Sequence, residues 1–540
     1  MIIKPINQLL LLIMMLCFAC WSSLSSAAEL QSLSDVKTAL LSKKSSDKQD
    51  AIEWLSQSSD TEQAKNILTP WLEGDLYFRK SDDALFVIPS LKTGQTATAL
   101  FDAKDATIDN TRDFSKVRTN NSLRSDIRDV IARIDVSAND PIIRLQAVNS
   151  LLGTTNAKTI EKMHTQLASE SNADVQSAIE LALAMNQVQT SDNANEKVAA
   201  IEVIGQSKQS EVYGILSQII HSDAQDEVKQ AAQLALNTYQ QKQKFYGGVE
   251  TVFFGLSLGS VLVLAGIGLA ITFGVMGVIN MAHGELIMIG AYTTYVIQQI
   301  MPNNIGLALL LSIPAAFVVS GLVGIVIERS VIRRLYGRPL ETLLATFGIS
   351  LILQQAVRSI FSPLNRSVST PDWMSGALSI NPMLSLTYNR LYIIIFCFMV
   401  FLALVAILKK TPLGLQVRAV SQNRAMARAM GVRSERVDAM TFGLGSGIAG
   451  VAGVALSQLT NVGPNMGQNY IIDSFMVVVF GGVGNLWGTL VAGLSLGLFN
   501  KILEPWAGAV LAKILVLVFI ILFIQKRPKG LFPQRGRAAE

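Results

Sequence analysis

The stretch GVINMAHGE, residues 277–285, places an asparagine, a histidine and a glutamate between two apolar runs. A charged side chain in hydrocarbon is costly, so ionisable residues in such sequence usually face a packed or hydrated interior and are functional candidates. We expect Asn280 and His283 to line or gate a pathway for a small polar molecule, because an amide and an imidazole both donate and accept hydrogen bonds. Glu285 is expected to form a structural pair or to lie at a helix N-terminus. The alternatives are a purely structural motif and a loop at the membrane face with solvated side chains.

A cluster of glycines forms the second group of candidate site residues. Gly481, Gly482 and Gly484 lie close together in an apolar segment. We expect them to break a helix and to expose backbone groups to the pathway. Further glycines recur along residues 443–453 and 488–497, where small residues let helix backbones approach closely in lipid. The alternative is that most of these glycines only pack helices together.

These residues belong to one half of a chain whose two halves differ in chemistry. Half of the 540 residues are hydrophobic and only 16% are charged, which is typical of a membrane protein. Residues 31–244 are polar, whereas apolar runs of membrane-crossing length recur over residues 249–524. The shorter runs are expected to be tilted, half-length or re-entrant. The expected spans cover residues 249–273, 286–301, 305–327, 343–361, 391–408, 437–456, 471–484, 490–503 and 509–524.

Basic residues are distributed unevenly between the loops that join these spans. If the polar half is outside the membrane, the loops near residues 329–338, 409–436 and 526–537 are cytoplasmic and hold most of the loop arginines and lysines. The opposite loops hold only Arg366 and Arg390. This asymmetry follows the positive-inside rule and predicts an odd number of crossings with a cytoplasmic C-terminus. The net charge of +5 therefore needs no nucleic acid partner.

The segment before the first span is expected to be exported. Residues 1–28 combine Lys4, a short apolar run and small residues at positions 26–28, which together predict a secretory signal peptide, with an uncleaved anchor as the alternative. Residues 29–245 carry apolar residues at helical spacing in several similar stretches. This pattern indicates degenerate antiparallel helix pairs of the HEAT type, whose faces bind partners. The alternation in residues 74–89 predicts a β-hairpin.

Polar residues in the exported segment have mainly structural interpretations. Asp82 and Asp83 are expected to form a solvated turn, because no nucleophile or metal-ligand set accompanies them. Three histidines far apart in sequence make a metal cluster unexpected, and no cofactor is expected. Four residues are expected at or near helix starts, where a short polar side chain caps free backbone amides: Asp140, Asp174, Asn195 and Asp226.

Four motifs together resemble the permease subunits of branched-chain amino acid and urea ABC importers. They are GVINMAHGE, GLQVRAVSQNRAMARAMGV, FGGVGNLWGTLVAG and RPKGLFP, and the resemblance covers about residues 247–533. The exported helical extension is similar to that of the urea-type subgroup. The resemblance implies a bundle in the bacterial inner membrane that pairs with a second permease subunit, two cytoplasmic ATP-binding subunits and a periplasmic substrate-binding protein. The chain lacks Gly-x-x-x-x-Gly-Lys-Ser/Thr, so it is not expected to be an enzyme, and ATP hydrolysis is assigned to partners.

The basic loop over residues 411–436 is the expected contact for the ATP-binding subunits. Its middle, residues 423–430, is predicted to form a short helix that ends at Gly431 and lies across the cytoplasmic face. The family's Glu-Ala-Ala-x-x-x-Gly pattern aligns with residues 425–431, where Ala425 stands in place of the glutamate. The residues expected to couple the loop to the ATP-binding subunits are Gly414, Arg418, Asn423, Arg424, Ala427, Arg428 and Gly431.

The sequence therefore predicts an all-α protein with a polytopic transmembrane helix bundle at residues 246–530. An exported, mainly helical domain with a small β-hairpin precedes the bundle, and a cytoplasmic tail at residues 531–540 follows it. The predicted function is the permease subunit of an ATP-driven importer for urea. Import of branched-chain amino acids is the alternative within the family. A membrane receptor and an ATP-independent channel are the alternatives from other classes.

Overall fold

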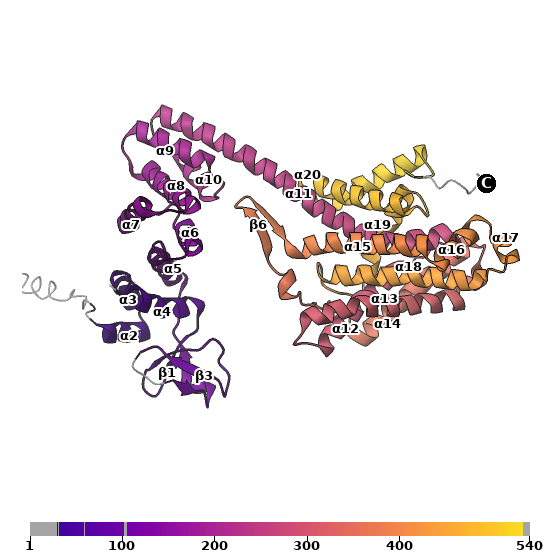
Figure 1. Ribbon diagram of the computed structural model, residues 1–540, viewed down its shortest axis with the longest axis horizontal. Helices are drawn as coiled ribbons and strands as arrows, with labels where there is room; N and C mark the ends of the chain where they lie inside the picture. The colour runs from indigo at the N-terminus through magenta and orange to yellow at the C-terminus, as the bar shows by residue number, and fades with distance from the viewer. Residues whose placement is uncertain (1–29, 31, 59, 102–104, 533–540) are drawn as a thin grey trace, which may run out of the picture. The chain divides into compact units, whose positions relative to one another are not determined.

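The computed structural model of the chain describes residues 30, 32–58, 60–101 and 105–532, and the chain divides into two compact units at residue 240 (Figure 1). The described residues are mainly helical, with two small β-sheets, so the predicted fold class is confirmed. The predicted signal peptide and most of the predicted tail lie outside the described residues. The junction near residues 240–248 lies inside one long helix.

The first unit is built mainly from short helices that pack on their neighbours along the chain. Contacts join α5 to α6, α6 to α8, and α8 to both α7 and α9, as expected for a stacked helical array. The helices are α2 (Leu33–Leu41), α3 (Ser45–Gln57), α4 (Thr61–Glu73), α5 (Asn121–Asp135), α6 (Pro141–Ser150), α7 (Ala157–Ser169), α8 (Ala173–Thr190), α9 (Ala194–Gln206) and α10 (Glu211–Ile220).

Side chains at the starts of these helices bind free backbone amides. Asp140 caps α6 as predicted, and Asp226 is the first residue of α11 (Asp226–Met276). The caps of α8 and α9 are Asn172 and Asn193, each two residues before the position that we predicted. The difference follows from geometry, because a side chain just outside the first turn reaches the free amides of that turn.

The predicted hairpin at residues 74–89 is confirmed, but it belongs to a larger sheet. The strands are β1 (Leu76–Arg79), β2 (Leu85–Val87), β3 (Thr96–Ala99), β4 (Ala106–Thr107) and β5 (Phe114–Lys116), in the order β4-β3-β2-β1-β5, with every pair antiparallel. In the β1–β2 turn, Arg79 Nε donates to Asp82 Oδ1 at 2.9 Å, and this contact lowers the pKa of Asp82 to about 2. The short outer strands were not predicted, because two to four residues carry little alternation.

The second unit contains long apolar helices. After α11 come α12 (His283–Ile300), α13 (Ile305–Ser330), α14 (Pro339–Phe361), α15 (Tyr388–Lys410), α16 (Pro412–Gln422), α17 (Arg424–Ala429), α18 (Ser434–Ser457), α19 (Met466–Gly481) and α20 (Leu486–Lys526). A hairpin of β6 (Ala377–Asn381) and β7 (Leu384–Thr387) joins α14 to α15. Short 3-10 turns are η1 (Thr111–Asp113) in the first unit and η2 (Ile332–Leu335) and η3 (Asp372–Met374) in the second.

Six of these helices are long and apolar enough to cross a membrane: α11, α13, α14, α15, α18 and α20. The helices α12 and α19 contain 18 and 16 residues, in line with the expectation of shorter segments. The last two predicted spans both fall in α20, where Gly508 has φ 77° and interrupts the helical backbone. The chain is therefore a multi-pass membrane protein.

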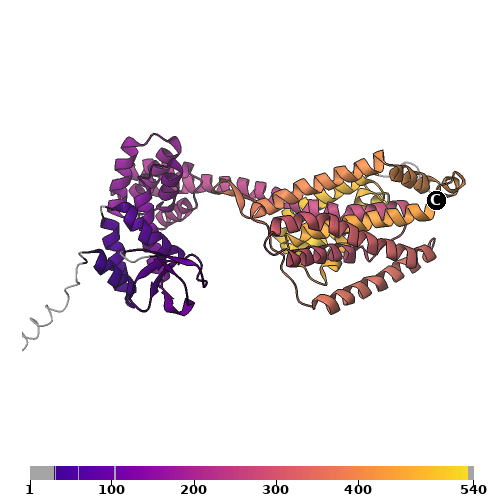
Figure 2. The same cartoon turned by 60° about the horizontal axis from the view of Figure 1, so that its bottom comes forward.

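The core of the second unit is a seam between α12, α13 and α18, which Figures 1 and 2 show side by side. A Cβ atom added to Gly290 of α12 would lie 2.0 Å from the carbonyl oxygen of Gly450 in α18. One added to Gly450 would lie 2.4 Å from Ser320 Oγ of α13. These glycines permit backbone contact between the three helices, as small residues do in membrane bundles.

Candidate functional site

The polar residues of GVINMAHGE form a buried group where α11 gives way to α12. The helix α11 ends at Met276, and Gly277 follows with φ 68°. Asn280, His283 and Glu285 are each at most 1% exposed. The alternative of a solvated loop is therefore wrong, because neighbouring helices enclose all three side chains.

Each of the three side chains has one polar atom bound and one without a partner. The Nε2 atom of His283 lies 2.8 Å from the carbonyl oxygen of Ala265, and Ser350 Oγ donates to Glu285 Oε1 at 3.0 Å. Asn280 Oδ1 accepts from a backbone amide within its own loop at 3.0 Å. Among the described residues, no partner is found for Asn280 Nδ2, His283 Nδ1 and Glu285 Oε2. Leaving such buried atoms unpaired costs about 1–3 kcal/mol each.

The hydrogen bond of His283 determines which ring atom is free to bind a solute. A carbonyl oxygen only accepts, so Nε2 carries the proton that is donated to Ala265. In the neutral ring Nδ1 is then an acceptor, while the side-chain amide of Asn280 offers a donor at Nδ2. The segment thus holds one buried donor and one buried acceptor that find no partner among the described residues.

A small cavity adjoins Asn280. Its volume is about 110 Å³, and α11, the loop after it and α19 form its walls. Asn280 is the only lining residue with an amide, and the others are apolar: Leu269, Ile279, Met281, Ile471, Ile472 and Phe475. The wall of the cavity is therefore almost entirely aliphatic and aromatic, with Asn280 as its polar residue.

The helix α14 holds the loop and the start of α12 through a polar stripe that sequence reasoning missed. Thr346 Oγ1 accepts from the backbone amide of Met281 at 3.2 Å, and Ser350 binds Glu285. The signal was present in the sequence, because polar residues recur every four positions along a mainly apolar helix and so share one face. All four are at most 5% exposed: Thr342, Thr346, Ser350 and Gln354.

The predicted break at Gly481 and Gly482 is present, and the C-terminal segment binds it. The helix α19 ends at Gly481, and Gly482 has φ 104°. Leu531 donates its backbone amide to the carbonyl of Phe480 at 2.9 Å, and Phe532 donates to Gly481 at 3.2 Å. The carbonyl groups of residues 480 and 481 are therefore paired with the chain itself, and the FGGVGN motif lies against residues 531–532 of the RPKGLFP motif.

Gly484 lies beside residues 411–436, the segment that we predict to contact the ATP-binding subunits and call the coupling loop. It has φ 79° and lines a cavity of about 210 Å³ together with Gly414 and Arg418. A Cβ atom at Gly414 would lie 2.0 Å from the carbonyl oxygen of Leu408, so α16 packs directly on the end of α15. The structure thus brings one predicted pathway glycine together with two predicted coupling residues.

The coupling loop contains the predicted short helix and an additional one before it. The short helix is α17, whose N-cap Asn423 accepts from a backbone amide at 2.9 Å, and Gly431 follows with φ 86°. The additional helix α16 was missed, because its apolar residues are too few for a span and its arginine resembles the surrounding loop. Ala427 is buried, so one side of α17 packs against the bundle.

The arginines of α17 bind α18 instead of standing free. Arg424 donates two hydrogen bonds to the carboxylate of Asp438, at 2.7 and 2.9 Å. Arg428 Nε donates to Ser434 Oγ at 2.7 Å. Opposite charges in a bidentate arrangement fix orientation as well as distance, so α17 is attached firmly to the start of α18.

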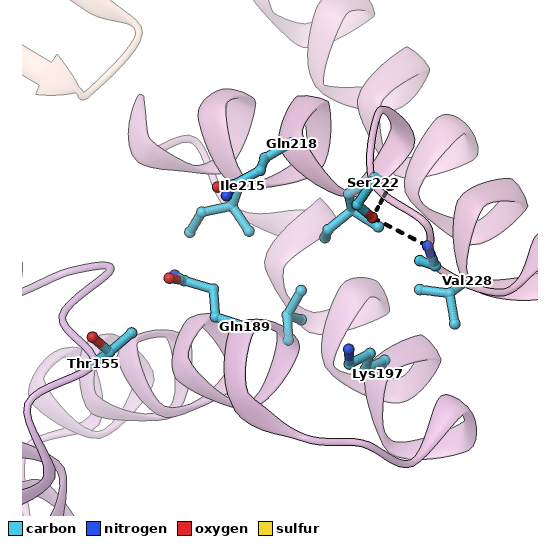
Figure 3. Close-up of a pocket in the computed structure, with 10 residues that line it drawn as sticks. Thr155, Gln189, Lys197, Ile215, Gln218, Ser222 and Val228 are labelled. Atoms are coloured by element: carbon cyan, nitrogen blue, oxygen red, sulfur yellow. Dashed lines mark hydrogen bonds between the residues drawn. The ribbon is translucent and has the colours of Figure 1, made fainter.

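The first unit has an open cleft of its own (Figure 3). Its volume is about 310 Å³; Ile215 and Val228 are apolar residues of its wall, and Gln189, Gln218 and Lys197 supply polar groups. These side chains come from α8, α9, α10 and the start of α11. Among the described residues of the whole chain, no cluster of three or more histidines, cysteines or carboxylates is placed to hold a metal ion.

Comparison with known proteins assigns most of the second unit to a protein family. The family model "Branched-chain amino acid transport system / permease component" matches residues 251–524, about half of the chain. Residues 1–250, and with them the whole first unit, lie outside this match. The buried polar group and the coupling loop both lie inside it. No solved structure matches the chain.

Curated relatives are matched over nearly their whole length. The high-affinity branched-chain amino acid transport system permease protein LivH of Salmonella typhimurium is 30% identical over 306 residues, which are 54% of this chain and 96% of that protein. LivH of Escherichia coli is 30% identical over 299 residues, with the same two shares. BraD of Pseudomonas aeruginosa, also a high-affinity branched-chain amino acid transport system permease protein, is 28% identical over 297 residues, 53% of this chain and 96% of BraD.

Proposed function

Because the chain belongs to the family of permease components of branched-chain amino acid transport systems, we propose that it is the membrane-spanning subunit of an ATP-driven importer in the bacterial inner membrane. Its partners in this proposal are a second permease subunit, two cytoplasmic ATP-binding subunits and a periplasmic substrate-binding protein. The chain supplies the passage and not the hydrolytic chemistry. The observation that carries the proposal is the buried Asn280 and His283, each with an unpaired polar atom, within the matched membrane segment.

Branched-chain amino acids are the substrates that the relatives favour over urea. The names of the matched relatives specify branched-chain amino acid transport. The cavity beside Asn280 agrees with this choice, because its wall is apolar and suits an aliphatic side chain. The amide of Asn280 and the imidazole of His283 then bind the polar part of the substrate.

Urea is retained as the second candidate because of the first unit. The relatives align over 96% of their length and still leave nearly half of this chain unmatched. This extra unit is the feature by which the chain resembles the urea-type subgroup. Urea is neutral and small, so one donor and one acceptor without a fixed charge would serve it as well.

Transport proceeds by alternating access in this proposal. ATP binding closes the partner subunits, the loop with α16 and α17 transmits that motion, and the bundle alternates between outward and inward openings. Asn280, His283 and Gly484 contribute to the passage, while Glu285 holds the start of α12 through Ser350. The first unit is periplasmic, and its cleft offers a contact for a partner.

Uptake of labelled substrates tests the proposed function directly. Cells with and without the chain are given labelled leucine and labelled urea, each alone and with the other as an unlabelled competitor. Loss of leucine uptake without the chain supports the amino acid, and loss of urea uptake alone supports the second candidate. Uptake of both at normal rates in cells that lack the chain would reject the importer role, and flux that survives ATP depletion would indicate a channel.

A further inference from the structure

Tyr336 joins the coupling loop to the end of α11. It follows η2 in the segment between α13 and α14. Its hydroxyl donates to the carbonyl oxygen of Met276 at 3.2 Å and accepts a hydrogen bond from Arg424 Nη2 of α17. The guanidinium of Arg424 also lies 4.2 Å from the centre of the tyrosine ring, in cation–π contact. One side chain therefore contacts two segments that are far apart in sequence.

On the coupling side, Arg424 is held rigidly. Its two hydrogen bonds to Asp438 fix the plane of the guanidinium, and the Asp438 side chain is only 6% exposed. A second contact lies nearby, where Arg333 of η2 donates to the carbonyl of Glu435 at 3.3 Å. We therefore expect a displacement of α17 to move the Tyr336 segment as well, because hydrogen bonds fix the side chains that connect them.

On the passage side, Met276 is the last residue of α11. A carbonyl group in the last turn of a helix has no partner within that helix, so the hydroxyl of Tyr336 satisfies a group that would otherwise be free. Gly277 follows at once with φ 68° and starts the loop that leads to Asn280 and His283. A movement of Tyr336 that displaces the Met276 carbonyl therefore displaces the first residue of that loop.

The surroundings allow Tyr336 to move. Gly337 follows it with φ 85°, and Gly431 follows α17 with φ 86°. A Cβ atom added at either glycine would meet no atom within 4 Å, so both lie in open space. Residues at loop positions with such freedom absorb the backbone rotation of hinge motions.

We propose that Tyr336 is a positioning residue that transmits movement of α17 to the end of α11 and so to the buried loop with Asn280 and His283. The inference rests on the proposed function, in which the ATP-binding subunits move the coupling loop. The passage therefore responds to the coupling loop through a hydrogen-bonded tyrosine, in addition to the continuous chain between α17 and α18. The hydroxyl carries the connection, and the aromatic ring keeps Arg424 in place.

The test compares Tyr336→Phe with Tyr392→Phe in the complete complex with its ATP-binding subunits. Tyr392 is a matched control, because both tyrosines are 38% exposed and Tyr392 packs against Trp373 in a different part of the unit. Tyr336→Phe keeps the ring under Arg424 and removes only the hydroxyl. We expect substrate uptake per ATP hydrolysed to fall about fivefold, as for one lost hydrogen bond, while ATP hydrolysis stays within about twofold of normal.

Hydrogen exchange provides a readout that does not depend on the substrate. In the natural complex, a non-hydrolysable ATP analogue is expected to change exchange in peptides that cover residues 277–282 and 424–430. In Tyr336→Phe the change at residues 424–430 is retained and the change at residues 277–282 is lost. The control variant keeps both changes.

Two results would overturn the inference: a normal ratio of uptake to hydrolysis in Tyr336→Phe, or a normal exchange response at residues 277–282 in that variant. Absence of leucine and urea uptake in the natural complex would instead reject the proposed function. In that case the exchange response of residues 277–282 to the ATP analogue still decides whether Tyr336 connects the two segments.

Discussion

At the scale of single residues, the buried loop can be tested because a structural role and a transport role lead to opposite expectations. An unpaired buried polar atom lowers stability, so replacing it with an apolar group is neutral or stabilising if the atom has no other task. Asn280 and His283 each retain such an atom within the apolar bundle. Their presence is explained if a solute binds the free atoms during passage.

His283→Ala is expected to reduce substrate uptake about tenfold while the complex still assembles. The variant removes the free acceptor at Nδ1, and one hydrogen bond to a passing solute corresponds to roughly this factor in rate. Initial uptake rates and the amount of complex recovered by affinity purification provide the measurement. His221→Ala is the control, because His221 is exposed and bonds only locally to the carbonyl of Ser217 at 2.7 Å. Normal uptake by assembled His283→Ala complexes would contradict the pathway role.

A buried ion pair in the first unit gives a prediction on acid stability. Arg144 Nε and Nη2 each donate to the carboxylate of Glu170 at 2.7 Å, and this pairing lowers the pKa of Glu170 from 4.5 to about 2. The folded pKa is depressed, so the stabilisation is complete above about pH 4.5 and is lost as the pH falls toward 2. We expect α6, α7 and α8 to lose hydrogen-exchange protection in that interval.

Glu170→Gln removes the charge that titrates. We expect the variant to destabilise the first unit by about 3 kcal/mol at neutral pH, because it leaves the buried Arg144 without its counter-ion. Between pH 4.5 and 2, the variant is then expected to lose less stability than the natural chain. Glu53→Gln is the control. Glu53 and Lys158 form an exposed pair at 3.6 Å, so its loss is expected to cost at most about 1 kcal/mol. Equal protection in Glu170→Gln and the natural chain would show that the pair contributes nothing to stability.

At the scale of elements, the sequence predicted which segments are helical better than which segments meet. The runs in α11, α13, α14, α15 and α18 were predicted from composition and length alone, because a membrane span has few alternatives. The contact between the FGGVGN and RPKGLFP motifs was not predicted. It consists of backbone hydrogen bonds between residues 480–481 and 531–532, and such bonds produce no pattern in the sequence. Tyr336 was missed for the same reason, since its partners lie far away in sequence.

The seam between α12, α13 and α18 predicts that a larger side chain is destabilising at Gly450 and tolerated at Gly348. In Gly450→Val the added side chain must displace Ser320 Oγ and the Ala316 carbonyl, which lie 2.4 and 2.5 Å from the Cβ position. Such overpacking costs about 1–3 kcal/mol, so we expect the apparent unfolding temperature in detergent to fall by about 5 °C. Gly348→Val in α14 is the control, because no atom lies within 4 Å of its Cβ position. Equal unfolding temperatures would contradict the close-packed seam.

At the scale of the whole molecule, the predicted order of membrane crossings assigns each loop of the second unit to one side of the membrane. Loops assigned to the same side contact each other in the structure. Residues 366 and 462 exchange two backbone hydrogen bonds, at 2.7 and 2.8 Å, and both belong to loops predicted to be periplasmic. Tyr336 contacts both Met276 and Arg424, and all three belong to segments predicted to be cytoplasmic. These contacts are therefore consistent with the predicted order of crossings. The distribution of arginines then predicts which set of loops is cytoplasmic.

Labelling of single cysteines tests that direction. In a chain whose natural cysteines are replaced by serine, Met430→Cys places a thiol after α17 and Leu364→Cys places one after α14. Both positions are well exposed, at 78% and 68%. A membrane-impermeant maleimide is expected to label Leu364→Cys in intact cells and to label Met430→Cys only after the membrane is opened, because the arginine-rich loop is held on the cytoplasmic side. The reverse pattern would invert the bundle and place the coupling loop where no ATP-binding subunit can reach it, so it would reject the proposed mechanism together with the orientation.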